Sequence, residues 1–317
     1  MPSLPREMTL SGFADEAADD IAGQIEATKA LGWSSIEARS VDGVNIHDLD
    51  EASFERCATA LEESGVRVCC FGSTIANWGR RVDEDFSVAL RTVDRAIGRM
   101  KRLGVPLIRL MSYSVFFDAD GRALPDQREA ERFARLREIC SRFIEASITP
   151  VHENCLNYGG MSWGHTLRLL AEVPGLRLVY DTGNPGLSHD FRKAFPYPNQ
   201  DSLETWARLK AFAVHIHIKD GRRDPATGEE SYFFPGEGDC RVADILSDLM
   251  AAGYAGMLSI EPHMAVVFHD SKVRSTARAR FDNYVEYGRR TEAMLRSLGC
   301  EVASGRARYS QKIPDGH

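Results

Sequence analysis

Eight short β-rich runs alternate with eight longer amphipathic stretches, and this alternation most constrains the fold. The β-rich runs cover residues 10–13, 35–39, 67–72, 106–111, 149–153, 177–181, 213–219 and 257–261. Helical patterns lie between them at 19–31, 52–64, 83–103, 126–146, 165–172, 201–209, 242–252 and 274–298. Strand then helix, repeated along the chain, requires parallel strands joined by right-handed crossovers. Eight such units predict a closed (β/α)8 barrel of the α/β class.

Glycine marks the ends of four predicted helices, just before the next strand, at Gly32, Gly65, Gly104 and Gly253. Glycine adopts the left-handed backbone that closes a helix, and other residues resist it. The resulting short turns suit a barrel in which each helix returns directly to the following strand. An open, doubly wound sheet is the alternative, but neither a GxGxxG motif nor a phosphate-binding loop follows the first strand.

The chain of 317 residues shows no internal linker. Its length fits one barrel, which takes ~250 residues before insertions. We therefore expect a single barrel domain over residues 1–302. Residues 303–317 are polar and lack a core pattern, so we interpret them as a disordered tail or as an arm onto another subunit.

The formal net charge is -7, from 46 acidic and 39 basic residues. Because an acidic surface repels a phosphate backbone, we expect no nucleic acid partner. No apolar run reaches the ~20 residues of a membrane span, so no membrane association is expected, and the first residues lack a signal segment. The seven cysteines show no CxxC spacing, which indicates reduced thiols and a cytoplasmic protein.

Polar residues stand near the ends of the last four predicted strands, where apolar residues are expected. Glu153, Asp181, His217 and Glu261 occupy equivalent positions in successive units. Because the C-terminal ends of barrel strands meet at one rim, these side chains converge. Three carboxylates and an imidazole at one point repel each other unless a cation is present. The pattern therefore predicts one divalent metal ion, Mn²⁺, Mg²⁺, Co²⁺ or Zn²⁺.

The motifs around these residues, VHEN, YDTGN, HIHIKD and SIEPH, resemble those of a known family. They are similar to the xylose isomerase-like TIM barrel superfamily, which includes sugar phosphate isomerases and epimerases, inosose dehydratase and AP endonuclease family 2. Residues 12–39 resemble the first unit of that family and residues 234–263 its last. The resemblance extends over most of residues 10–263, and it implies a TIM barrel enzyme with a small-molecule carbohydrate substrate.

The resemblance implies that Glu153, Asp181, His217 and Glu261 are the metal ligands. It also implies that Glu153 and Glu261 are catalytic, because the matching glutamates of the epimerases move a proton on either side of one substrate carbon. Carboxylates can do this because a chelated carbonyl acidifies that C–H bond and an enediolate forms. We therefore expect a metal-dependent sugar isomerase or epimerase, acting on a ketose, a sugar acid or a polyol-derived ketone.

Two further positions can be compared with the ketose epimerases. Those enzymes bind substrate through a histidine three residues after the aspartate, whereas this chain has Asn184. This departure leaves the identity of the substrate open. The basic substrate-binding residue six positions after the ligand histidine is matched by Arg223. The resemblance also implies a homo-oligomer, a dimer or a tetramer, because related barrels often form them.

Other polar residues near the rim are candidate substrate contacts. His215 shares the inner side of its strand with His217, one layer deeper, and Lys219 continues that side. Besides contacting substrate, His215 can support the site from below and Lys219 can pair with an acid. Glu237, in the sequence PGEGD, can bond a hydroxyl or serve a turn. Trp78 lies on a predicted rim loop, where it can wall a sugar site or contact another subunit.

Strand positions also indicate structural roles. Glu37 and Arg39 share one side of the second strand and are predicted to pair with each other. His152 points to the opposite side from Glu153, so we interpret it as a structural residue that faces the helices.

Three other functions stand as alternatives. A lyase of the inosose dehydratase kind begins with the same enediolate and then loses a β-hydroxyl. A DNA-repair endonuclease requires extra histidine ligands on strands three and four, which end CCFGST and IRLMSY without histidine. A non-catalytic sugar-binding barrel has no need of a complete ligand set, so the four candidate ligands disfavour it.

Overall fold

The predicted barrel strands are all present in the computed structural model, which describes residues 3–224, 226–266 and 275–312. They are β1 (Ser3–Gly12), β2 (Ser35–Ala38), β5 (Arg67–Phe71), β6 (Leu107–Leu110), β7 (Thr149–Glu153), β8 (Arg177–Asp181), β9 (Ala213–Ile218) and β12 (Met257–Ile260). Their order in the sheet is β1-β12-β9-β8-β7-β6-β5-β2. A parallel bridge between Phe13 and Glu37 brings β1 back to β2. The predicted (β/α)8 barrel is confirmed.

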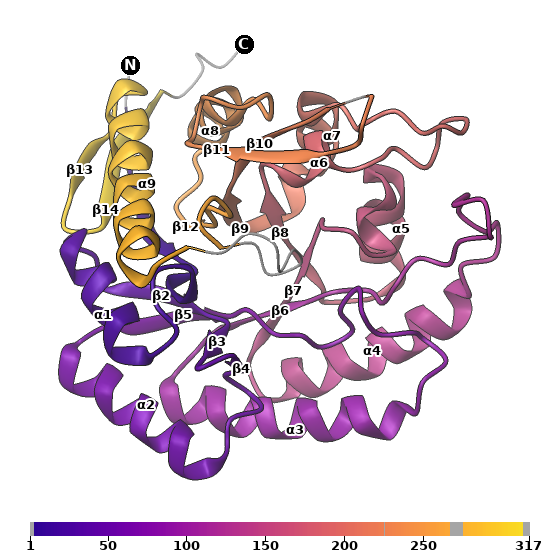
Figure 1. The fold of residues 1–317 in the computed structure, drawn as a ribbon, viewed down its shortest axis with the longest axis horizontal. Helices are drawn as coiled ribbons and strands as arrows, with labels where there is room; N and C mark the ends of the chain where they lie inside the picture. The colour runs from indigo at the N-terminus through magenta and orange to yellow at the C-terminus, as the bar shows by residue number, and fades with distance from the viewer. Residues whose placement is uncertain (1–2, 225, 267–274, 313–317) are drawn as a thin grey trace.

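Helices form an outer layer around these strands (Figure 1). They are α1 (Ile21–Ala30), α2 (Glu51–Ser64), α3 (Phe86–Leu103), α4 (Glu129–Glu145), α5 (Trp163–Glu172), α7 (Ser202–Leu209), α8 (Val242–Ala251) and α9 (Ala277–Ser297). Each matches a predicted stretch to within a few residues, and residue 274, the predicted start of the last helix, lies outside the described ranges. No helix of the described chain is both long enough and apolar enough to cross a bilayer.

Local sequence signals fix the ends of these helices. The side chains of four aspartates accept a hydrogen bond from the first turn of the helix that each precedes: Asp20, Asp50, Asp85 and Asp201. Each such cap contributes about 1 kcal/mol. The four glycines predicted to follow helices all have positive φ, between 67° and 80°. Helix starts and stops are therefore set by short motifs, independently of the barrel's long-range contacts.

The buried apolar residues of the barrel form two clusters. A large apolar core lies between the strands and the helices, whereas the interior of the barrel holds a small cluster made of Cys69, Cys70, Val151 and Val179. Because inward-facing residues alternate along each strand, the residues two positions after Val151 and Val179 also point inward. These are Glu153 and Asp181, so the small cluster is the floor beneath the predicted site.

Residues 303–312 extend the barrel sheet, so the prediction of a disordered tail or an arm onto another subunit is wrong for these residues. β13 (Glu301–Ala303) and β14 (Arg306–Lys312) form an antiparallel hairpin, and β14 pairs with the first part of β1. Ala307 and Tyr309 are buried by this pairing. The sequence misled because the outward residues of the strand are polar and the apolar ones are few. Residues 313–317 lie outside the described chain.

Loops after the strands add small elements at the rim, the C-terminal end of the barrel. A short helix, α6 (Asn184–Leu187), follows β8, and the hairpin of β10 (Asp220–Arg223) and β11 (Glu230–Phe233) follows β9. A hairpin of two short strands, β3 (Ser40–Val41) and β4 (Val44–Asn45), follows β2. These segments surround the place where the candidate ligands converge.

Candidate functional site

Four strand ends bring the predicted ligands together at the rim. Glu153 and Asp181 are the last residues of β7 and β8, His217 lies near the end of β9, and Glu261 directly follows β12. The strand register sets Asp181 beside His217. One ligand atom from each of the four side chains lies within 4.8 Å of the other three, and all four residues are buried.

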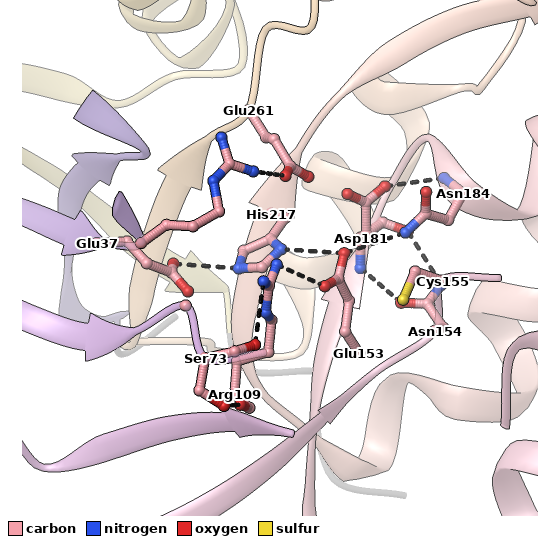
Figure 2. A network of polar contacts seen from close by, with 12 residues as sticks. Glu37, Ser73, Arg109, Glu153, Asn154, Cys155, Asp181, Asn184, His217 and Glu261 are labelled. Atoms are coloured by element: carbon pink, nitrogen blue, oxygen red, sulfur yellow. Dashed lines mark hydrogen bonds and ion pairs between the residues drawn. The ribbon is translucent and has the colours of Figure 1, made fainter. Parts of the chain in front are cut away.

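Hydrogen bonds fix the backbone around Asp181. Asn154 Oδ1 accepts from Asp181 N at 2.7 Å, and Asn154 Nδ2 donates to Asp181 O at 3.1 Å (Figure 2). Asp181 Oδ1 accepts from the backbone N–H groups of Gly183 and Asn184 at 2.7 and 2.8 Å, which leaves Oδ2 for the site. A Cβ at Gly183 would lie 2.8 Å from Lys219 Cγ, so glycine at this position makes room for the lysine.

Two buried atoms of the group fit an ion better than a hydrogen bond. His217 Nδ1 and Asp181 Oδ2 have no hydrogen-bond partner among the described residues, although Lys219 Nζ forms an ion pair with the aspartate oxygen at 2.9 Å and Glu153 Oε1 lies 3.6 Å from the histidine nitrogen. Buried polar atoms are rarely left unpaired, because that costs free energy. Carboxylate oxygens with one imidazole nitrogen suit Mn²⁺, Mg²⁺, Co²⁺ or Zn²⁺. The side chains present therefore fit one divalent ion.

Each candidate catalytic glutamate is held by its own arginine. Arg109 Nη1, from β6, donates to Glu153 Oε2 at 2.9 Å (Figure 2). Arg39 Nη1, just after β2, donates to Glu261 Oε1 at 2.9 Å. Both guanidinium groups lie over the ring of Phe13, with Cζ 5.3 and 4.4 Å from its centroid. One aromatic ring thus supports both arginines, and the arginines orient the two glutamates.

A third cation joins two of the ligands. Lys219 Nζ lies 2.9 Å from Asp181 Oδ2 and 3.0 Å from Glu261 Oε2. Repulsion among the acids is therefore relieved partly by the chain's own cations, which the sequence argument for a metal did not foresee. Carboxylates nevertheless outnumber the three cations at this end of the barrel. The carboxylates that contact these cations or His217 are those of Asp15, Glu16, Glu37, Glu153, Asp181 and Glu261.

The crowded charges shift the titration of the ligands. Burial opposes ionisation of Glu153, but Arg109 and His217 lower its pKa to about 2. Burial raises the pKa of Asp181 to about 6, helped by the charges of Glu261 and Glu153 and opposed by Lys219. Burial disfavours charge on His217, yet Glu37 and Glu153 raise its pKa to about 10. A divalent ion bound here would replace the extra proton of His217, because metal ligands bind deprotonated.

Glu37 lies beneath the ligands and binds two histidines. Its Oε2 accepts from His215 Nε2 at 2.7 Å and from His217 Nε2 at 3.1 Å. Because a carboxylate is only an acceptor, these contacts put an imidazole proton on Nε2 of each ring, and Nδ1 of His217 is then the atom that would bind an ion. The predicted pair between Glu37 and Arg39 is wrong, since Arg39 bonds Asp15 and Glu261 instead.

A cavity of about 430 Å³ opens above these side chains, a size that suits a small sugar. Three of the predicted substrate contacts line it, namely Lys219, Asn184 and Trp78. Asn184 Nδ2 also donates to Glu153 Oε1 at 3.2 Å. Leu156 and Tyr232 add apolar surface to the same wall.

The other three predicted substrate contacts lie elsewhere. His215 is fully buried one layer below His217 and bonds Glu37, so it supports the site and does not touch its contents. Glu237 is exposed and pairs with Arg290 of α9, because Asp220 binds the backbone N–H groups on either side of it and directs it outward. Arg223 bonds Asn199 Oδ1 at 3.3 Å and lines a separate polar hollow.

Five residues around the candidate ligands were either not singled out from the sequence, as for Arg109, Glu16 and His263, or given only a structural role, as for Glu37 and Arg39. Glu37 and Arg109 lie on β2 and β6, in the first half of the barrel, and Arg39 directly follows β2. Glu16 and His263 lie beside Glu261. The available signal was a charged residue inside an otherwise apolar strand, as in IRL and IEAR. This pattern identifies the charged residue but does not predict its hydrogen-bond or ion-pair partner, because the partners lie on other segments of the chain.

Comparison with known proteins agrees with this geometry. The family model described as xylose isomerase-like TIM barrel matches residues 25–283. A magnesium complex of a xylose isomerase-like TIM barrel protein from Mycobacterium smegmatis superposes with a TM-score of 0.63 at 16% identity, over 91% of this chain and 97% of that chain. D-allulose 3-epimerase from Methylomonas sp. gives 0.64 at 14% identity, over 92% and 99%.

A probable 3-DHS dehydratase from Bacillus anthracis has the same fold. It superposes with a TM-score of 0.60 at 15% identity, over 87% of this chain and 98% of that chain. The search of curated proteins gave no match. At these identities the solved structures establish the fold, and the chemistry has to be argued from the side chains at the rim.

Proposed function

The chain belongs to the xylose isomerase-like TIM barrel family, and from this premise we propose that it is a divalent-metal-dependent isomerase or epimerase of a carbohydrate. The observation that carries the proposal is the convergence of Glu153, Asp181, His217 and Glu261 within 4.8 Å, with two of their buried atoms, His217 Nδ1 and Asp181 Oδ2, making no hydrogen bond within the described chain. A bound divalent ion would polarise a substrate carbonyl and favour loss of the neighbouring proton.

The chain's own residues supply the two bases. Glu153 and Glu261 stand on β7 and β12, with β8 and β9 between them in the sheet, so a substrate in the cavity meets one glutamate from each side. Arg109 keeps Glu153 ionised and Arg39 contacts Glu261 in the same way. One glutamate removes the proton of the substrate carbon, and the other returns a proton to the opposite face, through an enediolate.

The cavity favours a small, uncharged substrate of the ketose kind. Arg39, Arg109 and Lys219 all line it, but each already pairs with a carboxylate of the site. A phosphate or carboxylate would therefore have to compete with fixed acids for these cations. Asn184, which stands where ketose epimerases have a histidine, is fixed on Glu153 and can bond a hydroxyl with its remaining capacity.

Dehydration of a keto-polyol is the second candidate. Both reactions begin with removal of a proton next to a carbonyl, and they separate only if a β-hydroxyl then leaves. Lys219 favours this alternative, because its ammonium lies 3.0 Å from Glu261 Oε2, where a departing hydroxyl would gain from a nearby positive charge.

The test is exchange of substrate hydrogen with solvent. Mn²⁺-loaded protein is incubated in D₂O with D-tagatose, D-allulose, L-ribulose and a keto-inositol, and NMR follows deuterium incorporation, new stereoisomers and loss of water. We expect deuterium in at least one compound. Glu153→Gln and Glu261→Gln should abolish isomer formation, and one of them should retain exchange on a single face. Glu237→Gln, a surface glutamate, is the matched control. Fully loaded protein that incorporates no deuterium and releases no water would refute the proposal.

A further inference from the structure

Phe13, which directly follows β1, is fully buried, yet it belongs to neither of the two apolar clusters that the described residues form. Buried phenylalanines ordinarily pack among other apolar side chains. Two guanidinium groups and one imidazole lie against the ring of Phe13, and all three belong to the candidate site. Burial beside charged groups indicates a role other than filling the apolar core.

Both arginines that hold the candidate catalytic glutamates lie over this one ring. The Cζ atoms of Arg39 and Arg109 lie 4.4 and 5.3 Å from its centroid, within the ~6 Å of a cation–π contact. Two like charges repel each other, but the negative potential of an aromatic face attracts both. Arg39 donates to Glu261 at 2.9 Å, and Arg109 donates to Glu153 at 2.9 Å. The ring therefore links the two glutamates through their arginines.

The same ring contacts a candidate metal ligand. The imidazole of His217 meets it edge to face, with centroids 5.0 Å apart and an interplanar angle of 75°. The backbone of Phe13 is also fixed, because its N–H donates to the carbonyl of Ile260 at 3.0 Å, and Glu261 directly follows Ile260. One side chain thus touches the supports of both glutamates and one ligand of the candidate ion.

Gly72, directly after β5, leaves the space that this ring occupies. A Cβ at position 72 would lie 2.6 Å from Phe13 Cε1 and 3.1 Å from Arg39 Cβ. Carbon atoms do not approach one another as closely as the first distance, so a side chain here would displace the ring. Gly72 does not have a positive φ, so the glycine serves the space and not the backbone conformation.

We propose that Phe13 is a positioning residue, whose ring sets the separation of Glu153 and Glu261 by binding the arginine of each. The separation matters because the two bases must reach one substrate carbon from opposite sides. A misplacement of about 1 Å can slow such a reaction about a hundredfold. This inference rests on the proposed function, and it adds that the two bases depend on one shared aromatic contact.

Packing alone is the competing interpretation, in which any apolar side chain of this size would serve. The two interpretations differ in what they require of the ring. Packing requires only its volume, whereas a cation–π contact requires the negative potential of its face. Fluorine atoms on the ring withdraw that negative charge and change the volume little, so they separate the two interpretations.

The experiment is Phe13→3,4,5-trifluorophenylalanine, incorporated through a reassigned stop codon. NMR of the metal-free protein follows the Nε–H groups of Arg39 and Arg109, assigned with Arg39→Lys and Arg109→Lys. We expect these protons to exchange with water about tenfold faster, because a weaker contact with the ring leaves the guanidinium groups less fixed. In Mn²⁺-loaded protein, deuterium incorporation into the best substrate should be about tenfold slower at saturation, with KM within about twofold of wild type.

Three further variants complete the design. Phe143→3,4,5-trifluorophenylalanine alters an equally buried ring that lies in the large apolar core, and it should leave the arginine protons and the rates unchanged. Gly72→Ala displaces the Phe13 ring without changing its chemistry, and it should also speed the exchange of both arginine protons. Gly98→Ala is the matched control for the glycine, because an added Cβ there meets nothing within 4 Å.

The inference is overturned if the trifluoro variant of Phe13 keeps the arginine proton exchange of wild type, or if it slows deuterium incorporation no more than the Phe143 variant does. Should that variant fail to fold, the arginine proton exchange of Gly72→Ala decides the same question. If wild type exchanges no substrate hydrogen at all, the proposed reaction fails, and the arginine protons still decide whether Phe13 fixes the two arginines.

Discussion

The strands from β7 onward and the strands before them contribute different kinds of side chain to one site. The residues that face the candidate ion lie at the ends of β7, β8, β9 and β12. Arg39, Arg109 and Glu37, which hold those residues in place, lie on β2 and β6 or directly after β2. One half of the barrel thus supplies the candidate ligands and the other half supplies their supports. The comparison separates what binds an ion from what prepares the binding groups.

The largest effect is expected from a ligand of the second half. Asp181→Asn keeps the backbone hydrogen bonds to the side-chain oxygen but removes the charged ligand. We expect Mn²⁺ affinity to fall on the order of a thousandfold, about 4 kcal/mol, with little change in melting temperature. Calorimetric titration measures it. Binding within tenfold of wild type would mean that Asp181 is not a ligand.

A support from the first half should affect stability more than affinity. Arg109→Met leaves Glu153 buried without its cation, which should cost about 3 kcal/mol of unfolding free energy in the metal-free protein. Saturating Mn²⁺ should recover part of this loss, because the ion supplies positive charge to the same carboxylate. Urea unfolding with and without Mn²⁺ measures both quantities.

The control for Arg109 is Arg102, which pairs with Glu62 and Glu55 on the surface. Arg102→Met should cost less than about 1 kcal/mol, as exposed ion pairs do. If the two variants unfold at the same urea concentration, the division of the barrel into ligands and supports is wrong.

Glu37 connects the two halves through His217, so replacing it should lower the metal affinity less than replacing a candidate ligand does. Glu37→Gln removes the carboxylate that fixes the His217 ring, and loss of such a partner typically weakens metal binding 10–100-fold. Nitrogen NMR of the histidines should show a mixture of ring tautomers in the variant. An unchanged tautomer with unchanged affinity would leave Glu37 as a packing residue only.

The smallest effect is expected on stability, from His152 on β7, where the two halves of the barrel meet. His152 Nε2 contacts Ser112 Oγ and Asn157 Oδ1, each at 3.0 Å. Burial lowers the pKa of His152 to about 4, while the unfolded chain has about 6.5. Between these values the unfolded state binds the proton more readily, so stability falls as the pH drops through this window.

This shift predicts a loss of about 1 kcal/mol from pH 7 to pH 5.5 in metal-free protein. Urea unfolding at the two pH values measures it. His152→Asn should remove this part of the pH dependence, and an unchanged slope in that variant would assign the effect to other groups.

The same division explains what could be predicted from the sequence. The strands, the helices and the four candidate ligands follow from periodicity and short motifs, which are local in the chain. Arg109 and Glu37 could not be assigned partners, because each contact joins strands many residues apart. The predicted Glu37–Arg39 pair shows the error: residues on one side of a strand need not bond each other when carboxylates from two other segments converge on the same arginine.

The misplaced residues have an equally physical cause. Glu237 and Arg223 lie in loops, where position along the chain says little about direction. The backbone contacts of Asp220 turn Glu237 toward α9, and the β10–β11 hairpin carries Arg223 away from the cavity. Strand alternation correctly places His215 one layer below His217. At that level it is fully buried and cannot contact a substrate.

The pairing of β14 with the first part of β1 has a consequence for the synthesis of the chain. β14 pairs with β1 across contacts such as Arg6 Nε to Gln311 Oε1, which are 305 positions apart. During synthesis β1 emerges long before β14, and this stretch of its edge stays unpaired until β14 has been translated. Contacts of such long range form slowly, and an unpaired edge invites association with other chains. A chain shortened before β14 would keep that exposed edge permanently and should aggregate.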